Sequence, residues 1–277
     1  MVYVRPTFTE TGNTIMLRGF YNAASGMTAQ QRKTDMLNNN IANANTPGYK
    51  SDQSAIRTFP EQLLHAENAG RGPHTIGSLG TGVYMQDQAP SFTPGELQET
   101  NASSDVALLE AEVPDENGAV LFTVQGEDGT AYTRNGNWTV DAEGFLTTAN
   151  GQYILNNEGA PVETGNENFQ ITENGTVILE NGGEAGQLGV AYAPDTNDLV
   201  KTEAGVFEAE EELGAAADNE DVRYQMKQGF LEQSNTDSTQ AMTELMEAYR
   251  MFESNQKVMQ TYDRSMEKAV NEVGRLG

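Results

Sequence analysis

The chain has 277 residues, of which 37% are hydrophobic and 21% charged, so it is long enough to bury a core and too apolar for general disorder. It has no cysteine, which excludes disulfides, cysteine nucleophiles and thiolate metal sites, and its only imidazoles are His65 and His74. No membrane-spanning run and no Sec-type signal peptide are visible.

The negative charge is concentrated in the middle of the chain. The net charge is −25, and residues 71–220 alone hold 3 Lys/Arg against 27 Asp/Glu, whereas the two ends are nearly neutral. A solvated acidic surface, suited to a high-salt or alkaline exterior, is the simplest interpretation. Nucleic acid is not an expected partner, because phosphate binding needs clustered Lys or Arg.

The first predicted element is an N-terminal amphipathic helix. Its apolar residues recur at spacings of three and four, although Gln31 and Thr34 make the middle of the stripe polar. A helix with so interrupted a stripe needs a packing partner. The stripe comprises Leu17, Phe20, Tyr21, Ala24, Met27, Leu37, Ile41 and Ala44.

The end of this helix is rich in asparagine, with the sequence NNNIANANTPGYK from Asn38 to Lys50. Asparagine tolerates left-handed backbone and bonds locally to it, so it suits a helix C-terminus. Pro47 stops the helix, and Pro47-Gly48 fits the centre of a type II turn. A plain helix stop explains residues 45–48 but leaves the earlier asparagines unexplained.

The acidic middle is predicted to be an antiparallel meander. Glycines follow polar residues at intervals of seven or eight, at positions 129, 136, 144, 151 and 159, and the pattern returns at 175 and 182. Such dipeptides supply the positive φ that tight hairpin turns require. Short strands are expected at 132–133, 138–140, 145–147, 153–155 and 176–179.

The C-terminal segment has the heptad pattern of a coiled coil. With Met242 at position a, eight of the ten a and d positions are apolar. Asp237 is the predicted N-cap, with Gln240 as its capping-box partner. The helix could pack on its own domain, on the N-terminal helix or on neighbouring subunits. The a and d positions are Met242, Leu245, Tyr249, Phe252, Gln256, Met259, Asp263, Met266, Val270 and Val273.

These elements predict an α+β fold in which an antiparallel β-rich central domain is inserted between N- and C-terminal amphipathic, coiled-coil-forming helices. The expected parts are a leader of unknown role (1–15), the N-terminal helix and linker (16–70), the acidic β-rich domain (71–228) and the C-terminal helix (229–277). Terminal helices that close on each other across an insertion suit a self-assembling tube.

Four blocks of sequence resemble the flagellar rod and hook family, the axial proteins of the bacterial flagellum, and most of all the rod proteins. In chain order they are LRGFYNAASGMTAQQRKTDMLNNNIANANTPGYK, LGTGVYMQDQAPSFTPGELQETNASSDVAL, LFTVQGEDGTAYTRNGNWTVDAEGFLTTANG and QGFLEQSNTDSTQAMTELMEAYRMFESNQKVMQTYD. The resemblance runs from Met16 to about Val270. Residues 109–120 and the fifteen residues before Met16 depart from the family pattern.

The resemblance implies a structural subunit of the basal-body rod, not an enzyme and without a cofactor or metal. Its implied partners are copies of itself, other axial proteins and the flagellar type III export apparatus, which would export it without a cleaved signal peptide. The implied location is the flagellar basal body. A hook-type subunit and a secreted hydrolase using a pair of carboxylates are the alternatives, the latter because acidic residues are plentiful.

An assembly interface is predicted from the helical stripes together with the resemblance. The resemblance suggests that the asparagine amides bond between packed subunits or to the C-terminal helix. The predicted interface consists of Leu17, Phe20, Ala24, Met27, Leu37, Asn39, Asn40, Ile41, Asn43, Met242, Leu245, Tyr249, Phe252, Met259, Met266 and Val270.

Overall fold

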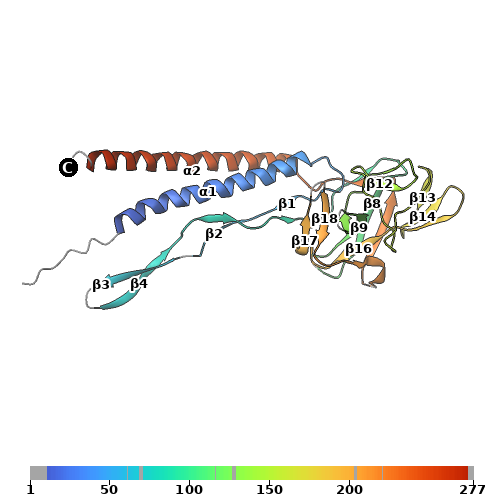
Figure 1. The fold of residues 1–277 in the computed structure, drawn as a ribbon, viewed down its shortest axis with the longest axis horizontal. Helices are drawn as coiled ribbons and strands as arrows, with labels where there is room; N and C mark the ends of the chain where they lie inside the picture. The colour runs from blue at the N-terminus through green and yellow to red at the C-terminus, as the bar shows by residue number, and fades with distance from the viewer. Residues whose placement is uncertain are drawn as a thin grey trace, which may run out of the picture. The chain divides into compact units, whose positions relative to one another are not determined.

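The computed structural model describes residues 11–60, 62–68, 71–115, 117–126, 129–202, 205–219 and 221–273. In chain order, one long helix precedes and another follows a β-rich region, whose described strand pairs are all antiparallel (Figure 1). This confirms the predicted α+β class. Within the described residues, no helix is both long and apolar enough to cross a membrane. The chain forms two compact units, one made of Met1–Asn39, Ser54–Gln88 and Thr239–Gly277 and the other of Asn40–Gln53 and Ala89–Ser238.

The first unit is built on an antiparallel helix pair. Helix α1 spans Thr11–Ala42 and α2 spans Ser238–Val273, so α2 begins directly after the predicted N-cap Asp237. Residues further along α1 contact residues earlier in α2, as expected for antiparallel helices. Gly19 lies against Tyr262, Gly26 lies against Asn255, and Lys33 Nζ stands 3.4 Å from Glu244 Oε2. The N-terminal helix therefore has its packing partner within the same chain.

Two antiparallel strand pairs complete this unit. Strand β2 (Ile56–Thr58) pairs with β5 (Val83–Met85), and β3 (Gln62–Asn68) pairs with β4 (Arg71–Leu79). Ser25 Oγ of α1 accepts a hydrogen bond of 3.3 Å from Val83 N, which fixes β5 against the helix. His65 and His74 fall in β3 and β4, whose side chains lie outside the described residues.

The inward stripe of α2 is shifted from the predicted heptad. The d residues Leu245, Phe252, Met259 and Met266 do lie in it, half-buried, but Met242 and Tyr249 at position a are 51% exposed. The residues just before the first four a positions point inward instead, and two of them, Asn255 and Tyr262, fit against glycines of α1. The observed stripe, with steps of four and three, is Ala241, Leu245, Ala248, Phe252, Asn255, Met259, Tyr262 and Met266.

Small residues set the inward face of α1. Ala23, Gly26 and Ala29 are buried, whereas the predicted Tyr21 is 64% exposed and Phe20, Ala24 and Met27 are half-buried. Large apolar side chains dominated the predicted stripe, but close helix approach favours residues without bulk. Thr34 is buried even though it interrupts the apolar pattern.

The second unit contains a six-stranded sheet in the order β17-β18-β10-β9-β16-β19. The central strand β9 is buried on both faces: Val120, Phe122 and Val124 pack into a large apolar cluster with Trp138, and Leu121 packs into a smaller one with Phe207. The sheet strands are β9 (Ala119–Gln125), β10 (Thr130–Thr133), β16 (Val190–Ala193), β17 (Leu199–Lys201), β18 (Val206–Ala209) and β19 (Gly214–Ala215).

Smaller sheets surround this one. Strand β8 continues through residues 109–112 of the segment that departs from the family pattern, and it pairs with β20. The remaining strands are β1 (Asp52–Gln53), β6 (Ala89–Pro90), β7 (Leu97–Glu99), β8 (Val106–Glu112), β11 (Trp138–Val140), β12 (Leu146–Thr148), β13 (Phe169–Ile171), β14 (Thr176–Leu179), β15 (Glu184–Gln187), β20 (Arg223–Gln228) and β21 (Phe230–Glu232), with 3-10 turns η1 (Thr196–Asp198) and η3 (Ala216–Asp218).

The glycine turns are largely confirmed, but the simple meander is not. Of the glycines that predicted turns, six have positive φ, and only Gly136 does not. Gly136 instead packs closely against the Val106 carbonyl. Residues 153–155 form isolated bridges rather than a strand. Strand β9 takes its second neighbour, β16, from far along the chain, so pairing between distant strands replaces the expected sequential order.

Candidate functional site

The asparagine-rich segment belongs to the β-rich unit from Asn40 onward. The buried Asn40 amide donates from Nδ2 to Asp52 O (2.9 Å), and its Oδ1 accepts from Asp52 N (2.9 Å) and Tyr49 Oη (3.1 Å). These three hydrogen bonds all join Asn40 to residues 9 or 12 positions further along the chain. The amide holds the turn that follows α1, and these three bonds do not reach α2, while the predicted bonds of the asparagine amides between packed subunits stay a prediction.

The predicted turn at Pro47-Gly48 is present. Tyr49 N donates to Thr46 O (3.3 Å), and Gly48 has a φ of +66°, as a type II turn requires at its third residue. Gly48 also packs on the backbone of Arg134, where a Cβ atom would stand 2.5 Å from the carbonyl carbon. The turn thus brings the next residue, Lys50, against the sheet.

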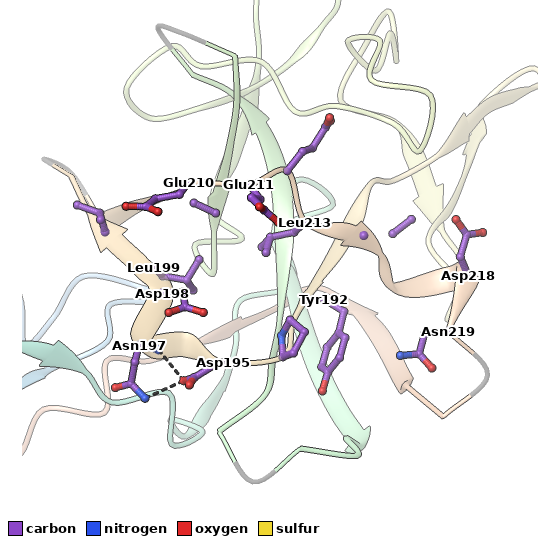
Figure 2. Close-up of a pocket in the computed structure, with 16 residues that line it drawn as sticks. Tyr192, Asp195, Asn197, Asp198, Leu199, Glu210, Glu211, Leu213, Asp218 and Asn219 are labelled. Atoms are coloured by element: carbon purple, nitrogen blue, oxygen red, sulfur yellow. Dashed lines mark hydrogen bonds between the residues drawn. The ribbon is translucent and has the colours of Figure 1, made fainter.

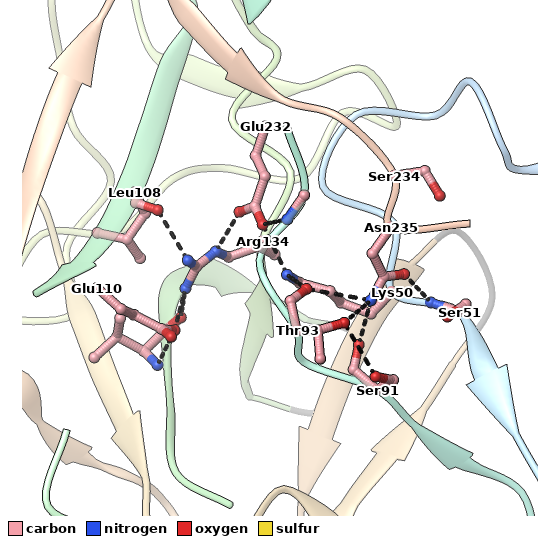
Figure 3. Close-up of polar contacts among 12 residues, drawn as sticks. Lys50, Ser51, Ser91, Thr93, Leu108, Glu110, Arg134, Glu232, Ser234 and Asn235 are labelled. Atoms are coloured by element: carbon pink, nitrogen blue, oxygen red, sulfur yellow. Dashed lines mark hydrogen bonds and ion pairs between the residues drawn. The ribbon is translucent and has the colours of Figure 1, made fainter. Parts of the chain in front are cut away.

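Lys50, Glu110, Arg134 and Glu232 form a buried ion-pair group, called here the junction cluster (Figure 3). Glu232 bridges the two cations, with Oε1 2.8 Å from Lys50 Nζ and Oε2 2.7 Å from Arg134 Nε. The side chains of Lys50, Arg134 and Glu232 are only 2–3% exposed. Two positive and two negative groups leave the cluster neutral, which burial requires.

Backbone groups satisfy the rest of the cluster. Arg134 donates from Nη2 to Leu108 O (2.9 Å) and from Nη1 to Val120 O, so its guanidinium joins β8 to β9. Lys50 Nζ donates to Thr93 O (3.0 Å), and Glu232 Oε1 accepts from Gly95 N (2.8 Å). Removing one partner from such a buried pair typically costs about 3–5 kcal/mol.

Glu232 is held in its charged form. Burial by itself would raise the pKa of its carboxyl, but the positive charges of Arg134 and Lys50 and the hydrogen bond from Gly95 N outweigh burial and lower that pKa below its ordinary value. The carboxylate therefore acts as a fixed anion at neutral pH.

A second ion pair fastens the same N-terminal segment to the sheet. Lys201 of β17 stands 3.0 Å from Asp52 Oδ1, donates to Lys50 O (2.8 Å) and lies 3.8 Å from the centroid of the Tyr49 ring. The last contact is a cation–π interaction. One lysine thus contacts three residues of the segment that follows α1.

The segment before α2 meets this N-terminal segment directly. Asn235 Oδ1 accepts from Ser51 N (2.8 Å), and its Nδ2 donates to Ser91 O (2.8 Å). Gly48 N donates to Glu232 O (2.7 Å), and β21 pairs with β7. The residues just after α1 and just before α2 are therefore joined within the β-rich unit.

Outside the stripe, α2 carries two exposed apolar strips. Strip A consists of Met242, Met246 and Tyr249, which are 51–57% exposed, and strip B consists of Met251 and Val258, which are 51% and 42% exposed. Met242 and Tyr249 follow stripe residues, whereas Met251 and Val258 precede them, so at 100° per residue the strips lie on opposite flanks of the stripe. Such strips are unusual on a helix that has no further neighbour.

A surface pocket of about 1010 Å³ lies in the β-rich unit, between residues 192–200 and 209–219 (Figure 2). Its lining contains carboxylates, including Asp195, Asp198 and Glu211, and apolar side chains, including Leu199 and Leu213. Across the described residues, no group of three or more acidic or histidine side chains is arranged to hold a metal ion. The pocket belongs to the acidic surface that the composition predicts.

The sequence matches three family models, in the same order as the structural elements. "Flagella basal body rod protein" matches residues 20–50, "Flagellar hook protein FlgE/F/G D1 domain" matches 117–179, and "Flagellar basal body rod FlgEFG protein C-terminal" matches 227–272. Lys50, Arg134 and Glu232 come one from each of these segments, so the junction cluster joins all three.

Curated relatives cover almost the whole chain. The flagellar hook-basal body complex protein FlhO of Bacillus subtilis (strain 168) is 46% identical over 272 residues, covering 94% of this chain and 100% of that protein. The basal-body rod protein FlgG of the same organism is 31% identical, with 92% and 99% covered. The rod protein FlgF of Caulobacter vibrioides (strain ATCC 19089 / CIP 103742 / CB 15) is 28% identical, with 94% and 100% covered. The chain belongs to the flagellar basal-body rod protein family.

The predicted interface residues of this rod-family chain divide into three groups. Leu37 and Asn40 are buried within the chain, and most others are half-buried along the helix pair. Asn39, Met242, Tyr249 and Val270 are exposed, and the Leu17 side chain lies outside the described residues. The half-buried members are Phe20, Ala24, Met27, Ile41, Asn43, Leu245, Phe252, Met259 and Met266.

The junction cluster was not predicted, although the sequence contains a signal for it. Between residues 72 and 222 the chain has only two basic residues, Arg134 and Lys201, amid many acids. A lone cation in so acidic a segment is a good candidate for a buried partner of a carboxylate. Both residues are in fact held in ion pairs.

Proposed function

We propose that this chain is a structural, non-enzymatic subunit of the bacterial flagellar rod, and that it assembles with copies of itself and with other axial proteins through its terminal helices. The helices would pack as coiled coils in the wall of the rod. The family membership supports the rod assignment, and the helix surface supports the mode of assembly.

The two exposed strips of α2 carry this proposal. The stripe between them, which contains Tyr262 and Asn255, is already occupied by α1. Strips A and B therefore offer two further apolar surfaces on opposite flanks, whereas the remaining face is polar, with Thr243, Glu247 and Ser254. Two different surfaces on one element favour head-to-tail contacts that continue from copy to copy over a closed dimer.

The route to the rod is proposed to be the flagellar type III apparatus. The resemblance to exported axial proteins supports this route. On this proposal the N-terminal helix stays attached, so Met16 to Tyr49 remains intact in the assembled protein. Mass spectrometry of the protein taken from purified basal bodies tests it, and a cleaved N-terminal helix would contradict it.

Cysteine cross-linking tests the helix contacts, because the native chain has no cysteine. Met246→Cys places a thiol in strip A, and Ser254→Cys places one at an exposed position on the polar face of the same helix. Under mild oxidation of purified basal bodies, we expect covalent adducts between rod subunits from Met246→Cys and much less from Ser254→Cys. Equal cross-linking of both, or none, would contradict contacts through strip A.

A further inference from the structure

The apolar core of the β-rich unit comes from a single span of sequence. The fully buried members of its two hydrophobic clusters all lie between Val106 and Met226. That span also contains two basic side chains that are largely withdrawn from water, Arg134 at 2% and Lys201 at 14% side-chain exposure. Folding the core therefore takes two cations out of solvent together with the apolar residues.

Each of these cations is neutralised by a carboxylate from outside the core span. Arg134 Nε is 2.7 Å from Glu232, which follows the span, and Lys201 Nζ is 3.0 Å from Asp52, which precedes it. The span is rich in carboxylates of its own, yet only Glu110 contributes to these pairs, at 2.7 Å from Arg134. Glu110 is also the most exposed member of the junction cluster, with 15% side-chain exposure.

The two outside segments also depend on each other. Lys50 and Glu232 are paired although 182 residues separate them, and Ser51 N bonds to Asn235 Oδ1 across 184 residues. Loss of residues 40–53 would thus leave Lys201 without its carboxylate, and loss of residues 229–238 would leave Lys50 without one and Arg134 with Glu110 alone. Uncompensated buried charges rank among the most destabilising defects in a protein.

We infer that the junction cluster and the Lys201–Asp52 pair make folding of the β-rich unit conditional on both flanking segments, residues 40–53 and 229–238. A chain that lacks either flank, because it is cut short or only partly delivered, keeps this unit unfolded. Both flanking segments must be present before the apolar core of the β-rich unit folds. The inference concerns folding of the single chain and does not depend on rod assembly.

The sole tryptophan makes this inference testable in the full-length protein. Trp138 is 1% exposed and packs edge-on against Phe122 at 4.8 Å between ring centroids, so its fluorescence reports whether the core is closed. The variants are Glu232→Ala for one flank and Asp52→Ala for the other. Glu158→Ala and Asp198→Ala are matched controls, because they remove the same charges from exposed positions.

The pattern of amide hydrogen exchange distinguishes a folding condition from a local contact. In both flank variants we expect exchange across β9, β10 and β16 to rise together by about two to four orders of magnitude, with Trp138 exposed at lower denaturant, and the controls to match the native protein. Glu232→Gln and Asp52→Asn should show the same joint rise in exchange across β9, β10 and β16, but a smaller one. These milder variants provide the measurement if the alanine variants do not fold. Faster exchange confined to residues near 48–52, 93–95 and 134, with β9 still protected, would overturn the inference, as would unchanged exchange.

Discussion

Gly26 of α1 lies so close to Asn255 of α2 that a Cβ atom at Gly26 would stand 2.8 Å from Asn255 Nδ2. Gly19 repeats the relationship one heptad earlier, against Tyr262. The helix pair is therefore held together by small residues on α1 that receive larger side chains from α2. This arrangement fixes which face of α2 is occupied and which faces are left for other contacts.

A large side chain at Gly26 should separate the two helices. Gly26→Leu forces overlap with Asn255, and overpacking of this kind costs about 1–3 kcal/mol, more than the roughly 1 kcal/mol gained in helix propensity. Hydrogen exchange should become faster in both α1 and α2. Thr28→Leu adds the same side chain at an exposed position of the same helix and should leave exchange unchanged. Equal effects of the two variants would contradict the pairing.

Gly48 should tolerate alanine far less well than a glycine in open space. Gly48 (φ +66°) and Gly159 (φ +80°) both require left-handed backbone, but a Cβ at Gly159 meets nothing within 4 Å, whereas one at Gly48 meets the Arg134 backbone at 2.5 Å. Gly159→Ala should cost about 1–2 kcal/mol of unfolding free energy. Gly48→Ala should cost clearly more in denaturant melts followed by Trp138 fluorescence, and similar costs would argue against the close contact.

Acid should destabilise the β-rich unit through Glu232. Its folded pKa is lowered below the ordinary 4.5, so its stabilising charge is fully present above that pH and is lost as the pH falls through the lowered pKa. Protonation of the acidic surface relieves repulsion and acts in the opposite direction, so a reference variant is needed. The gap in melting temperature between the native protein and Glu232→Gln should narrow from pH 7 to pH 3. A constant gap would show that Glu232 carries no such charge.

The sequence predicted the two helices, the turn at Gly48 and most glycine turns, because these depend on local backbone preferences and on periodicity. It did not predict that Ala241 and Ala248, rather than Met242 and Tyr249, point inward, since that register depends on small residues of a helix far away in sequence. The pairing of β9 with β16 and of Lys50 with Glu232 is likewise set by tertiary contacts, which a local pattern does not contain.

Assembly should be sensitive to ionic strength. The two basic residues between positions 72 and 222 are engaged in ion pairs, so the acidic side chains of that span have little positive charge beside them. Copies brought side by side repel each other, and salt screens repulsion over about 10 Å at 0.1 M. Light scattering should show faster assembly of the purified protein at 0.5 M than at 0.05 M NaCl. Slower assembly at the higher salt would indicate that attractive ion pairs dominate instead.

Strip A should be needed for assembly and not for folding of the β-rich unit. Met246 is 57% exposed, so Met246→Asp removes no core packing, yet it places a charge in the proposed contact. We expect loss of rod incorporation and of motility. The melting temperature of the β-rich unit, followed by Trp138 fluorescence, should stay within a few degrees of the native value. Ser254→Asp adds the same charge at an exposed position on the polar face of α2 and should assemble normally. Normal motility of Met246→Asp would remove strip A from the interface.

The most direct test of the rod assignment is a cryo-electron microscopy map of basal bodies purified from the source bacterium, with this chain placed by its side-chain density. We expect repeated copies in the axial rod, with α1 and α2 within the wall and strips A and B each covered by a neighbouring subunit. Absence of the chain from the rod, or a rod in which both strips face solvent, would contradict it.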